Sequence, residues 1–592
     1  DNVVHLDWEN APADHAILTV KWTLNQISYH AKRPKAGLIT RDADKPTTKA
    51  WLKLRNELKE RFRKIPVKIH LPIQNQLLWD QYRRCNGQEG LTLMDDEGND
   101  LNPEEARRQL AKMLQDRWSH ADGKHIPKRT ESQFGEGFPP TTREILKAIK
   151  ATNRKAATGL DGIPAKYVDQ IPVEDIQQLT ELIWRHTSIP RQLVDMKVKP
   201  IPKKDSRTTV QNTRPITIPS TVMKIINQVI LESITPYIED KLLPQQHAYR
   251  KGRGTATAIT ELFTKLKQPG QTLLLLDLSK AFDTVNHAAL FAALKKTGLP
   301  AKEYNLVRDQ YVDCEVRIQW AKRFAQPFLL RNGIRQGCTL STSLFNLVEA
   351  EREQKCRGKI PKWVNYSAIM YADDKAIIVD NPEHIQTIIE VNQQTASDYG
   401  MRQNNEKTAK LTLDMDTTEI RTVKWMGILL DNKLNMNPEV DARIRKAKAA
   451  ATTFADTVKT IPPSMLAARV RITGACAVIL PHLLYLWREI PFTPQQRSTM
   501  TDVATQLLAK VLGNTSGVSA RTILQHVENI TKGLTPRMKQ MAEIPWELQK
   551  DTYADLSIAQ TSDFHKQGQS VTVKKSGLSV YPPKNSVLLF SE

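Results

Sequence analysis

The chain has few of the residues that mark several common kinds of site. Its five cysteines are scattered over 592 residues without a CxxC pair, which argues against a zinc knuckle or a disulfide framework and favours a reducing compartment. No apolar run reaches the roughly 18 residues of a membrane-spanning helix, since the nearest, residues 472–487, is interrupted by Pro481 and His482. Walker phosphate loops, HExxH zinc motifs and hydrolase triad motifs are also missing. We therefore expect no membrane partner and none of these enzyme classes.

Positive charge, by contrast, is in excess. Lysine and arginine together number 85 against 64 aspartates and glutamates, which gives a formal net charge of +21. A field of this sign favours a polyanion, and nucleic acid is the commonest one. A ribosomal or membrane-surface protein would also be basic, so the charge supports a nucleic-acid partner without selecting it.

Two acidic segments stand out within this basic chain. Residues 273–283 read LLLLDLSKAFD, and the leucine run predicts a strand that is buried on both sides and ends at Asp277. Residues 367–380 read SAIMYADDKAIIVD, which predicts a β-hairpin with Asp373 and Asp374 at its tip. Singly, such aspartates are usually turn residues or solvated. Together they can converge on two divalent cations about 3.5–4 Å apart, an arrangement that catalyses phosphoryl transfer, and this favours a nucleotide polymerase.

These segments resemble the palm motifs of reverse transcriptases, and DLSKAFDTVNH is most similar to the polymerases of non-LTR (LINE-type) retrotransposons. The resemblance covers residues 141–512 and implies an α+β fold, the right-hand polymerase with fingers, palm and thumb, extended at both ends by mainly helical segments. Further segments resemble the family in its own order: residues 155–168, 243–255, 333–346, 398–408 and 423–430.

The resemblance divides the chain into four parts. Asp14-His15, before an apolar strand, is similar to the closing strand of apurinic-type endonucleases, so residues 1–25 are interpreted as an endonuclease remnant; a chance surface pair is the alternative. An apolar stripe at helical spacing predicts an amphipathic helix with a basic outer face: Trp51, Leu54, Leu58 and Phe62. The parts are an N-terminal extension with basic helices (1–140), fingers and palm (141–432), a basic helical thumb that grips the duplex by its phosphates (433–513) and a C-terminal extension (514–592).

The resemblance also implies the catalytic roles. Asp277 and Asp373 are expected to bind two Mg²⁺ ions, for which Mn²⁺ can substitute, and the carbonyl of Leu278 to reach the second ion. Asp374 is expected to ligate one ion or to serve the architecture. Lys407 is a candidate proton donor to the leaving pyrophosphate, although exposed lysines are ordinary.

Residues 191–214 are rich in lysine and arginine, and residues 198–218 are predicted to form two strands joined by a polar loop, a basic hairpin, which in the family closes over the incoming triphosphate. The resemblance implies that Arg214 grips the phosphates, because its planar fork bonds two oxygens at once. Lys203 or Lys204 is expected to assist. A solvent-facing basic hairpin is the alternative.

The remaining site residues follow from the same resemblance. Phe282 corresponds to an aromatic gate that leaves no room for a ribose 2′-hydroxyl and so favours deoxynucleotides, with core packing as the alternative. Gln336 and Gly337 are expected under the nascent base pair. Nucleic-acid contacts are expected from Arg250, Lys251, Arg253, Trp425 and Gly427.

The predicted reaction is attack of a DNA primer 3′-hydroxyl on the α-phosphorus of a dNTP, copied from an RNA template. An RNA-dependent RNA polymerase is disfavoured by Phe282. The second hypothesis is a domesticated protein that acts as a structural RNA-binding subunit of a ribonucleoprotein complex. A mobile-element enzyme would act in the nucleus, whereas a domesticated one would act in the mitochondrion or another ribonucleoprotein compartment.

Overall fold

The structure is a computed structural model, and the part of the chain that it describes comprises residues 42, 44–63, 78–79, 81–82, 91–119, 128–129, 138–203, 207–461 and 468–511. These residues form two compact units. The first contains those up to 63 and from 91 to 412, and the second contains those between 78 and 82 and from 413 to 511. The predicted endonuclease remnant, the C-terminal extension and Lys204 lie outside the described residues.

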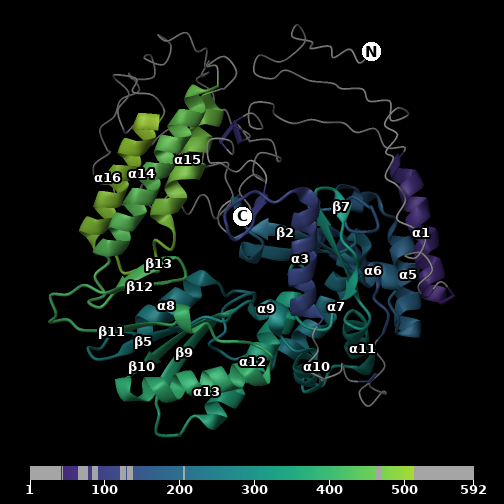
Figure 1. The fold of residues 1–592 in the computed structure, drawn as a ribbon, viewed down its shortest axis with the longest axis horizontal. Helices are drawn as coiled ribbons and strands as arrows, with labels where there is room; N and C mark the ends of the chain where they lie inside the picture. Colours follow the sequence, from purple (N-terminus) through teal and green to yellow (C-terminus); the bar gives the residue numbers. More distant parts are fainter. Residues whose placement is uncertain are drawn as a thin grey trace. The chain divides into compact units, whose positions relative to one another are not determined.

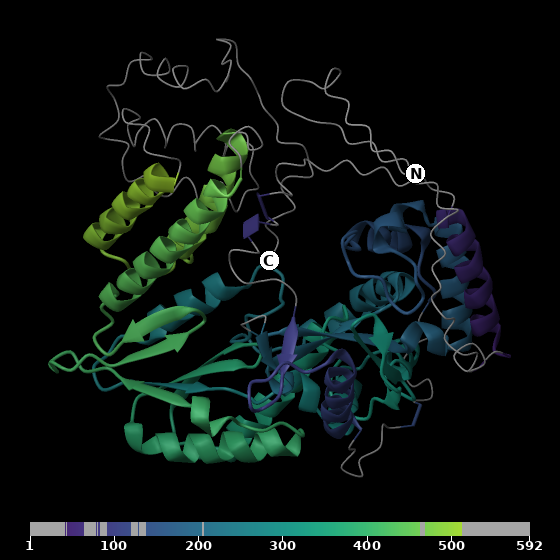
Figure 2. The ribbon, with the colours of Figure 1, turned by 45° about the horizontal axis from the view of Figure 1, so that its top comes forward.

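A four-stranded antiparallel sheet in the first unit carries both acidic segments. Its strand order is β11-β5-β10-β9, and helices α12 (Ser341–Lys359) and α13 (Ile385–Asp398) pack against one face (Figures 1 and 2). All five residues of β5 are buried, as the leucine run predicts. The predicted hairpin is also confirmed, because β9 and β10 pair on either side of the YADD tip. The strands are β5 (Thr272–Leu276), β9 (Tyr366–Tyr371), β10 (Asp374–Val379) and β11 (Ala409–Thr412).

A second sheet in the same unit contains the predicted basic hairpin. β2 pairs antiparallel with β4, which confirms the hairpin, and parallel with β6. β1 runs parallel to β3 at the loop of this hairpin. The strands of the second sheet are β2 (Met196–Pro202), β4 (Thr213–Ile218), β6 (Glu315–Trp320), β7 (Arg323–Phe324) and β8 (Phe328–Leu329). β1 (Thr92–Met94) and β3 (Arg207–Thr209) form a separate two-stranded sheet.

Helices surround these sheets, and the α+β fold class is confirmed. The stripe of Trp51, Leu54, Leu58 and Phe62 is buried on α1, as predicted. The other described helices of the unit are α3 (Pro103–Trp118), α4 (Thr142–Ala151), η2 (Ala165–Gln170), α5 (Val173–His186), α6 (Arg191–Val194), η3 (Val210–Asn212), α7 (Thr221–Glu239), α8 (Thr255–Lys265), α9 (Ala281–Thr284), α10 (His287–Lys295), α11 (Ala301–Asp309), η4 (Pro382–His384) and η5 (Asn405–Lys407), in addition to α1 (Pro46–Arg63).

From residue 413 to 511, the described residues of the second unit form a β-hairpin followed by packed helices. Segment 423–430, which resembles the family, contains parts of two strands, β12 (Thr422–Trp425) and β13 (Ile428–Asp431), because Gly427 adopts a positive φ of 83° and turns the chain. Tyr485 donates a hydrogen bond of 3.1 Å to the carbonyl of Met426 at this turn. The packed helices, which correspond to the predicted thumb, are α14 (Asn437–Lys459), α15 (Ala468–Leu484) and α16 (Pro494–Val511).

The cysteines and the apolar helices can be compared with the expectations from composition within the described residues. Cys314, Cys338, Cys356 and Cys476 are free thiols. Within the described part, none of the helices combines the length and apolar character needed to cross a membrane.

A buried histidine makes the first unit sensitive to acid. His287 begins α10, donates from Nε2 to the carbonyl of Gly333 at 2.9 Å, and contacts the ring of Tyr311. Burial, together with the nearby charge of Arg335, lowers its pKa to about 4, although the hydrogen bond to Gly333 acts in the opposite direction. Because the unfolded chain binds this proton near pH 6.5 and the folded chain does not, this contribution is intact above pH 6.5 and is lost as the pH falls towards 4.

We therefore expect the free energy of unfolding of the wild type to fall by about 3 kcal/mol more than that of His287→Gln between pH 7 and pH 4. Urea unfolding at several pH values measures this difference. Parallel pH profiles for the two proteins would contradict it.

Candidate active site

The sheet brings the three predicted catalytic carboxylates together. In the antiparallel pairing of β5 and β10, Lys375 lies opposite Leu276, so the next pair along the ladder sets Asp374 opposite Asp277. Asp373 shares the two-residue turn with Ala372, whose φ of 55° is unusual for a residue with a Cβ. A strained turn at the end of two buried strands fixes where these carboxylates point.

The carboxylates are close enough to influence one another's charge. Burial and the negative charges of Asp374 and Asp277 together raise the pKa of Asp373 to about 6. Burial also raises the pKa of Asp374, again helped by Asp277. Oxygen ligands of this kind suit Mg²⁺, and a divalent cation would relieve the repulsion between them.

The described residues nevertheless contain no group of three His, Cys, Asp or Glu side chains already gathered as a metal site. The donor chemistry therefore fits a divalent cation, while the ligand set of Asp277, Leu278, Asp373 and Asp374 stays a prediction. Leu278 is almost fully buried and forms an isolated antiparallel bridge with Gln403.

Lys407 lies directly beside the first carboxylate. The amide of Asn404 donates to the carbonyl of Asp277 at 2.8 Å, which brings η5 to the end of β5. The ammonium of Lys407 then lies 3.2 Å from Oδ2 of Asp277. Because 66% of the Lys407 side chain is exposed, this ion pair is worth at most about 1 kcal/mol and a divalent cation can displace it. Its position agrees with a role at the reacting phosphates, which stays a prediction.

A cationic cluster stands next to the carboxylates, made of Arg117, Lys203, Arg214 and Lys407. Burial lowers the pKa of Lys203, and the positive charges of Lys407, Arg117 and Arg214 lower it further. Lys280, which the sequence did not single out, has a pKa lowered by burial and then by Arg117 and Lys203. Cations that repel one another in this way favour a bound polyanion such as a triphosphate.

Asp283 organises the base of the site and is not one of the converging carboxylates. Arg117 of α3 donates to its Oδ2 at 2.8 Å, and the pair is almost fully buried. Gln336 donates to its Oδ1 at 3.4 Å. The sequence analysis did not identify its partner Arg117, which lies 166 positions away.

Gln336 and Gly337 are held against the basic hairpin. The amide of Thr217 on β4 donates to the carbonyl of Gln336 at 2.7 Å. A Cβ on Gly337 would lie 2.6 Å from the carbonyl oxygen of Thr217, and its φ is 95°. Only glycine fits this backbone, and the predicted contact with a base pair is untested.

Phe282 lies half-buried beside these groups. Its ring stacks on Phe345 with centroids 4.2 Å apart and an interplanar angle of 14°. One part of the ring therefore packs against the core, as the alternative interpretation of Phe282 expects. The rest of its surface is exposed and can contact a ligand. Both interpretations of Phe282 remain compatible with this geometry.

Several predicted nucleic-acid contacts have other partners. Trp425 is only 4% exposed, so the prediction that its ring contacts a primer is wrong, because the ring packs inside the second unit. Arg250 binds Glu239 at 2.7 Å and the carbonyl of Leu243 at 2.8 Å, and Arg253 bonds the carbonyl of Pro244. These arginines stiffen their loop. Lys251 and Gly427 are exposed, and their contacts stay predictions.

The basic face of the second unit is narrower than the sequence suggests. Arg443 is 2% exposed, bonds Glu439 at 2.7 Å and lies over the ring of Phe492, so it braces the helices. Arg445, Lys446 and Lys448 are exposed. These three remain the candidates on α14 for phosphate contacts.

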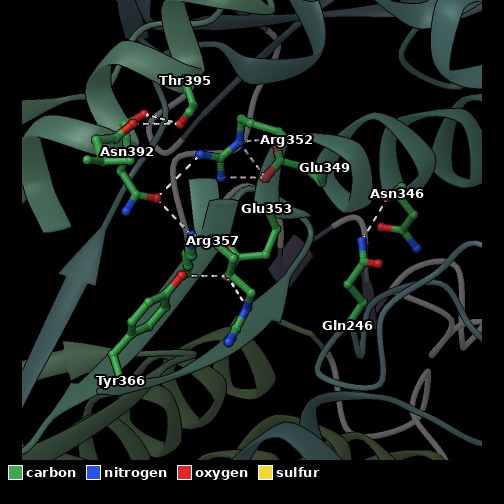
Figure 3. A network of polar contacts seen from close by, with 11 residues as sticks. Gln246, Asn346, Glu349, Arg352, Glu353, Arg357, Tyr366, Asn392 and Thr395 are labelled. Carbon is green, nitrogen blue, oxygen red and sulfur yellow. Dashed lines mark hydrogen bonds and ion pairs between the residues drawn. The ribbon is translucent and has the colours of Figure 1, made fainter. Parts of the chain in front are cut away.

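A buried polar network connects strand β10 to helices α12 and α13 (Figure 3). Lys375, next to Asp374 in the chain, bonds Glu353 of α12 and donates to Asn392 of α13 at 2.7 Å. Although burial opposes it, Lys375 and Arg352 hold the pKa of Glu353 below its usual value. The sequence analysis did not identify this network. The sequence signal for this network is Lys375, a charged residue at the start of the apolar strand that follows YADD.

Residues 201–430 match the sequence family described as reverse transcriptase (RNA-dependent DNA polymerase). The chain carries a reverse transcriptase domain. The match begins at the end of β2 and ends within β13, so it contains strand β4 of the basic hairpin and the whole four-stranded sheet. The predicted right-hand polymerase fold and the resemblance to non-LTR retrotransposon reverse transcriptases are confirmed for this domain.

The chain is also similar to curated polyproteins. It is 25% identical over 298 residues to the Retrovirus-related Pol polyprotein from type-1 retrotransposable element R2 of Nasonia vitripennis, which covers 49% of this chain and 29% of that protein. It is 24% identical over 274 residues to the Pol polyprotein from type-2 retrotransposable element R2DM of Drosophila melanogaster, covering 45% and 26%. The chain thus matches less than a third of the length of either relative.

A solved structure is similar at a lower level. The apo telomerase of Candida tropicalis shares 12% identity with this chain at a TM-score of 0.34, covering 60% of this chain and 69% of that one.

Proposed function

We propose that the protein is the RNA-directed DNA polymerase of a non-LTR retroelement, which extends a DNA primer with dNTPs along an RNA template. The observation that supports it most is the meeting of Asp277 with the Asp373–Asp374 pair beside the cationic cluster. A structural RNA-binding subunit has no need of buried carboxylates that repel one another. The basic composition agrees with nucleic-acid partners, and a ribonucleoprotein with the template RNA is the assembly in which such an enzyme would act, in the nucleus.

Each part of the site has a task in this reaction. Asp277, Asp373 and Asp374 would hold Mg²⁺, which when bound stabilises negative charge on the attacking and leaving oxygens. Arg214, Lys203 and Lys280 bind and orient the triphosphate through charge-assisted hydrogen bonds. Lys407 gives a proton to the pyrophosphate as it leaves.

Primer extension tests the proposal. Purified protein is incubated with a DNA primer annealed to RNA, the four dNTPs and Mg²⁺, and the products are resolved by length. We expect templated extension that EDTA abolishes. RNA binding that is unaffected by dNTP and Mg²⁺, with no product, would favour the structural subunit instead.

The variant Phe282→Ala tests whether Phe282 selects deoxynucleotides or serves only to pack the core. If the ring excludes the 2′-hydroxyl, the preference for dNTP over NTP, measured as a ratio of kcat/KM values, should fall by about 10²-fold. Phe282→Tyr keeps a ring at this position and should keep the preference. A Phe282→Ala protein that is less stable but equally selective would leave Phe282 as a packing residue only.

A further inference from the structure

An aromatic side chain outside the predicted site is brought to the catalytic turn by its backbone. The amide of Met370 on β9 donates to the carbonyl of Gln245, and the amide of His247 donates to the carbonyl of Met370, both at 2.9 Å. This segment therefore runs parallel to the end of β9. Met370 lies one residue before Tyr371, where the turn that holds Asp373 begins, so the pairing brings this segment, with Tyr249 two residues after His247, alongside the end of β9.

Buried side chains fix this segment in place. Gln246 donates from its side chain to the carbonyl of Asn346 at 2.8 Å (Figure 3). The side-chain amide of Asn346 donates in turn to the carbonyl of Ala248 at 2.7 Å. Both amide side chains are 2% exposed. On the other side of Tyr249, Arg250 is bound to Glu239. The backbone on both sides of Tyr249 is therefore held rigidly.

Tyr249 itself is strained and exposed. Its φ of 58° lies in the left-handed region, which a bulky side chain enters at a cost and which clusters at functional sites. Its side chain remains 54% exposed. Burial and then the charges of Asp373, Tyr371 and Asp374 raise the pKa of its hydroxyl, so the hydroxyl lies near the carboxylates. A rigid aromatic ring beside a reaction centre can pack against a ligand at little cost in conformational entropy.

We propose that Tyr249 binds the 3′-terminal nucleotide of the primer, its ring packing against that nucleotide and its hydroxyl donating a hydrogen bond to it. This contact rests on the proposed function, because only a polymerase keeps a strand end at these carboxylates. Lys251, exposed two residues on, is available for the adjoining backbone phosphate.

The test measures binding of the strand end apart from chemistry. A DNA primer carries 2-aminopurine either at its 3′ end or several nucleotides upstream, is annealed to RNA, and is titrated with wild type, Tyr249→Phe, Tyr249→Ala and the control Tyr237→Ala. Tyr237 is a half-exposed tyrosine on α7. The same proteins are then assayed for primer extension, and thermal unfolding reports whether each variant is folded.

We expect Tyr249→Ala to raise the KM for primer–template by about 10-fold or more, as loss of one stacked nucleotide does, and Tyr249→Phe by about 2- to 10-fold. The kcat at saturating primer–template and the KM for dNTP should be unchanged. The fluorescence change at the 3′ end should shrink in Tyr249→Ala while the upstream signal persists, and Tyr237→Ala should match wild type.

The failures can be told apart. Wild type that extends primers, with Tyr249→Ala and Tyr249→Phe at the wild-type KM, overturns this contact alone. A wild type that makes no product overturns the proposed function and the contact with it. If Tyr249→Ala does not fold, Tyr249→Phe decides, and its wild-type KM overturns the hydrogen bond on which the proposal depends.

Discussion

Asp373→Asn is expected to lower the rate of nucleotide incorporation by at least about 10³-fold, because several kcal/mol of charge stabilisation depend on this carboxylate and each 1.4 kcal/mol is worth tenfold. The free energy of unfolding, measured in EDTA, should stay the same or rise. Burial and neighbouring carboxylates raise the pKa of Asp373 to about 6, so a neutral side chain removes repulsion from the folded state. Loss of activity without loss of stability is the mark of a functional residue.

The matched control is Asp96→Asn, in an exposed acidic turn of the same unit. It should incorporate dNTPs at the wild-type rate. Primer extension in single turnover and urea unfolding measure both quantities. An Asp373→Asn enzyme within a few fold of wild type would remove this residue from the catalytic machinery.

Lys375→Met is expected to cost about 3–5 kcal/mol of unfolding free energy, since breaking a buried ion pair leaves the other charge uncompensated. The side chains of Lys375 and Glu353 are 4% and 0% exposed. Replacing both, as in Lys375→Met with Glu353→Leu, should recover most of that loss, because two apolar side chains leave no buried charge behind. Lys410→Met, an exposed lysine of the neighbouring strand β11, should change stability little.

The Lys375–Glu353 pair also attaches the hairpin that carries Asp373 and Asp374 to helix α12. Lys375 follows Asp374 directly on β10, while its partners Glu353 and Asn392 lie on the two helices beneath the sheet. We therefore expect Lys375→Met also to weaken Mg²⁺ binding, measured as a higher Mg²⁺ concentration for half-maximal extension. Urea unfolding of the single and double variants gives the coupling energy. Equal losses in the single and double variants would contradict a buried, mutually dependent pair.

The features that could be predicted from the sequence are those marked by a pattern of neighbouring residues. The leucine run of β5 is buried on both faces and therefore reads as an unbroken apolar string, and the polar YADD tip between two apolar runs marks the turn of β9 and β10. The strands, the turn and the order of the acidic groups follow from such patterns. So do the basic hairpin and the buried stripe of α1.

The remaining features depend on partners that are distant in the chain. Arg443 and Lys446 look alike in the sequence, but only the fold shows that the first is buried against Glu439 and the second is exposed. Trp425 is likewise buried in the folded second unit, although its neighbours in the sequence do not indicate this. Arg117 meets Asp283 only because α3 packs on α9. Local propensity carries no information about such pairings.

Ion binding tests the central claim most directly. Mn²⁺ uptake is followed by electron paramagnetic resonance in a complex of the protein with RNA template, a chain-terminated DNA primer and the matching dNTP, so that no reaction occurs. We predict that wild type and Asp96→Asn take up a pair of ions per complex, and that Asp277→Asn and Asp373→Asn lose them. Mn²⁺ uptake by Asp373→Asn equal to that of wild type would contradict a catalytic centre built on these carboxylates.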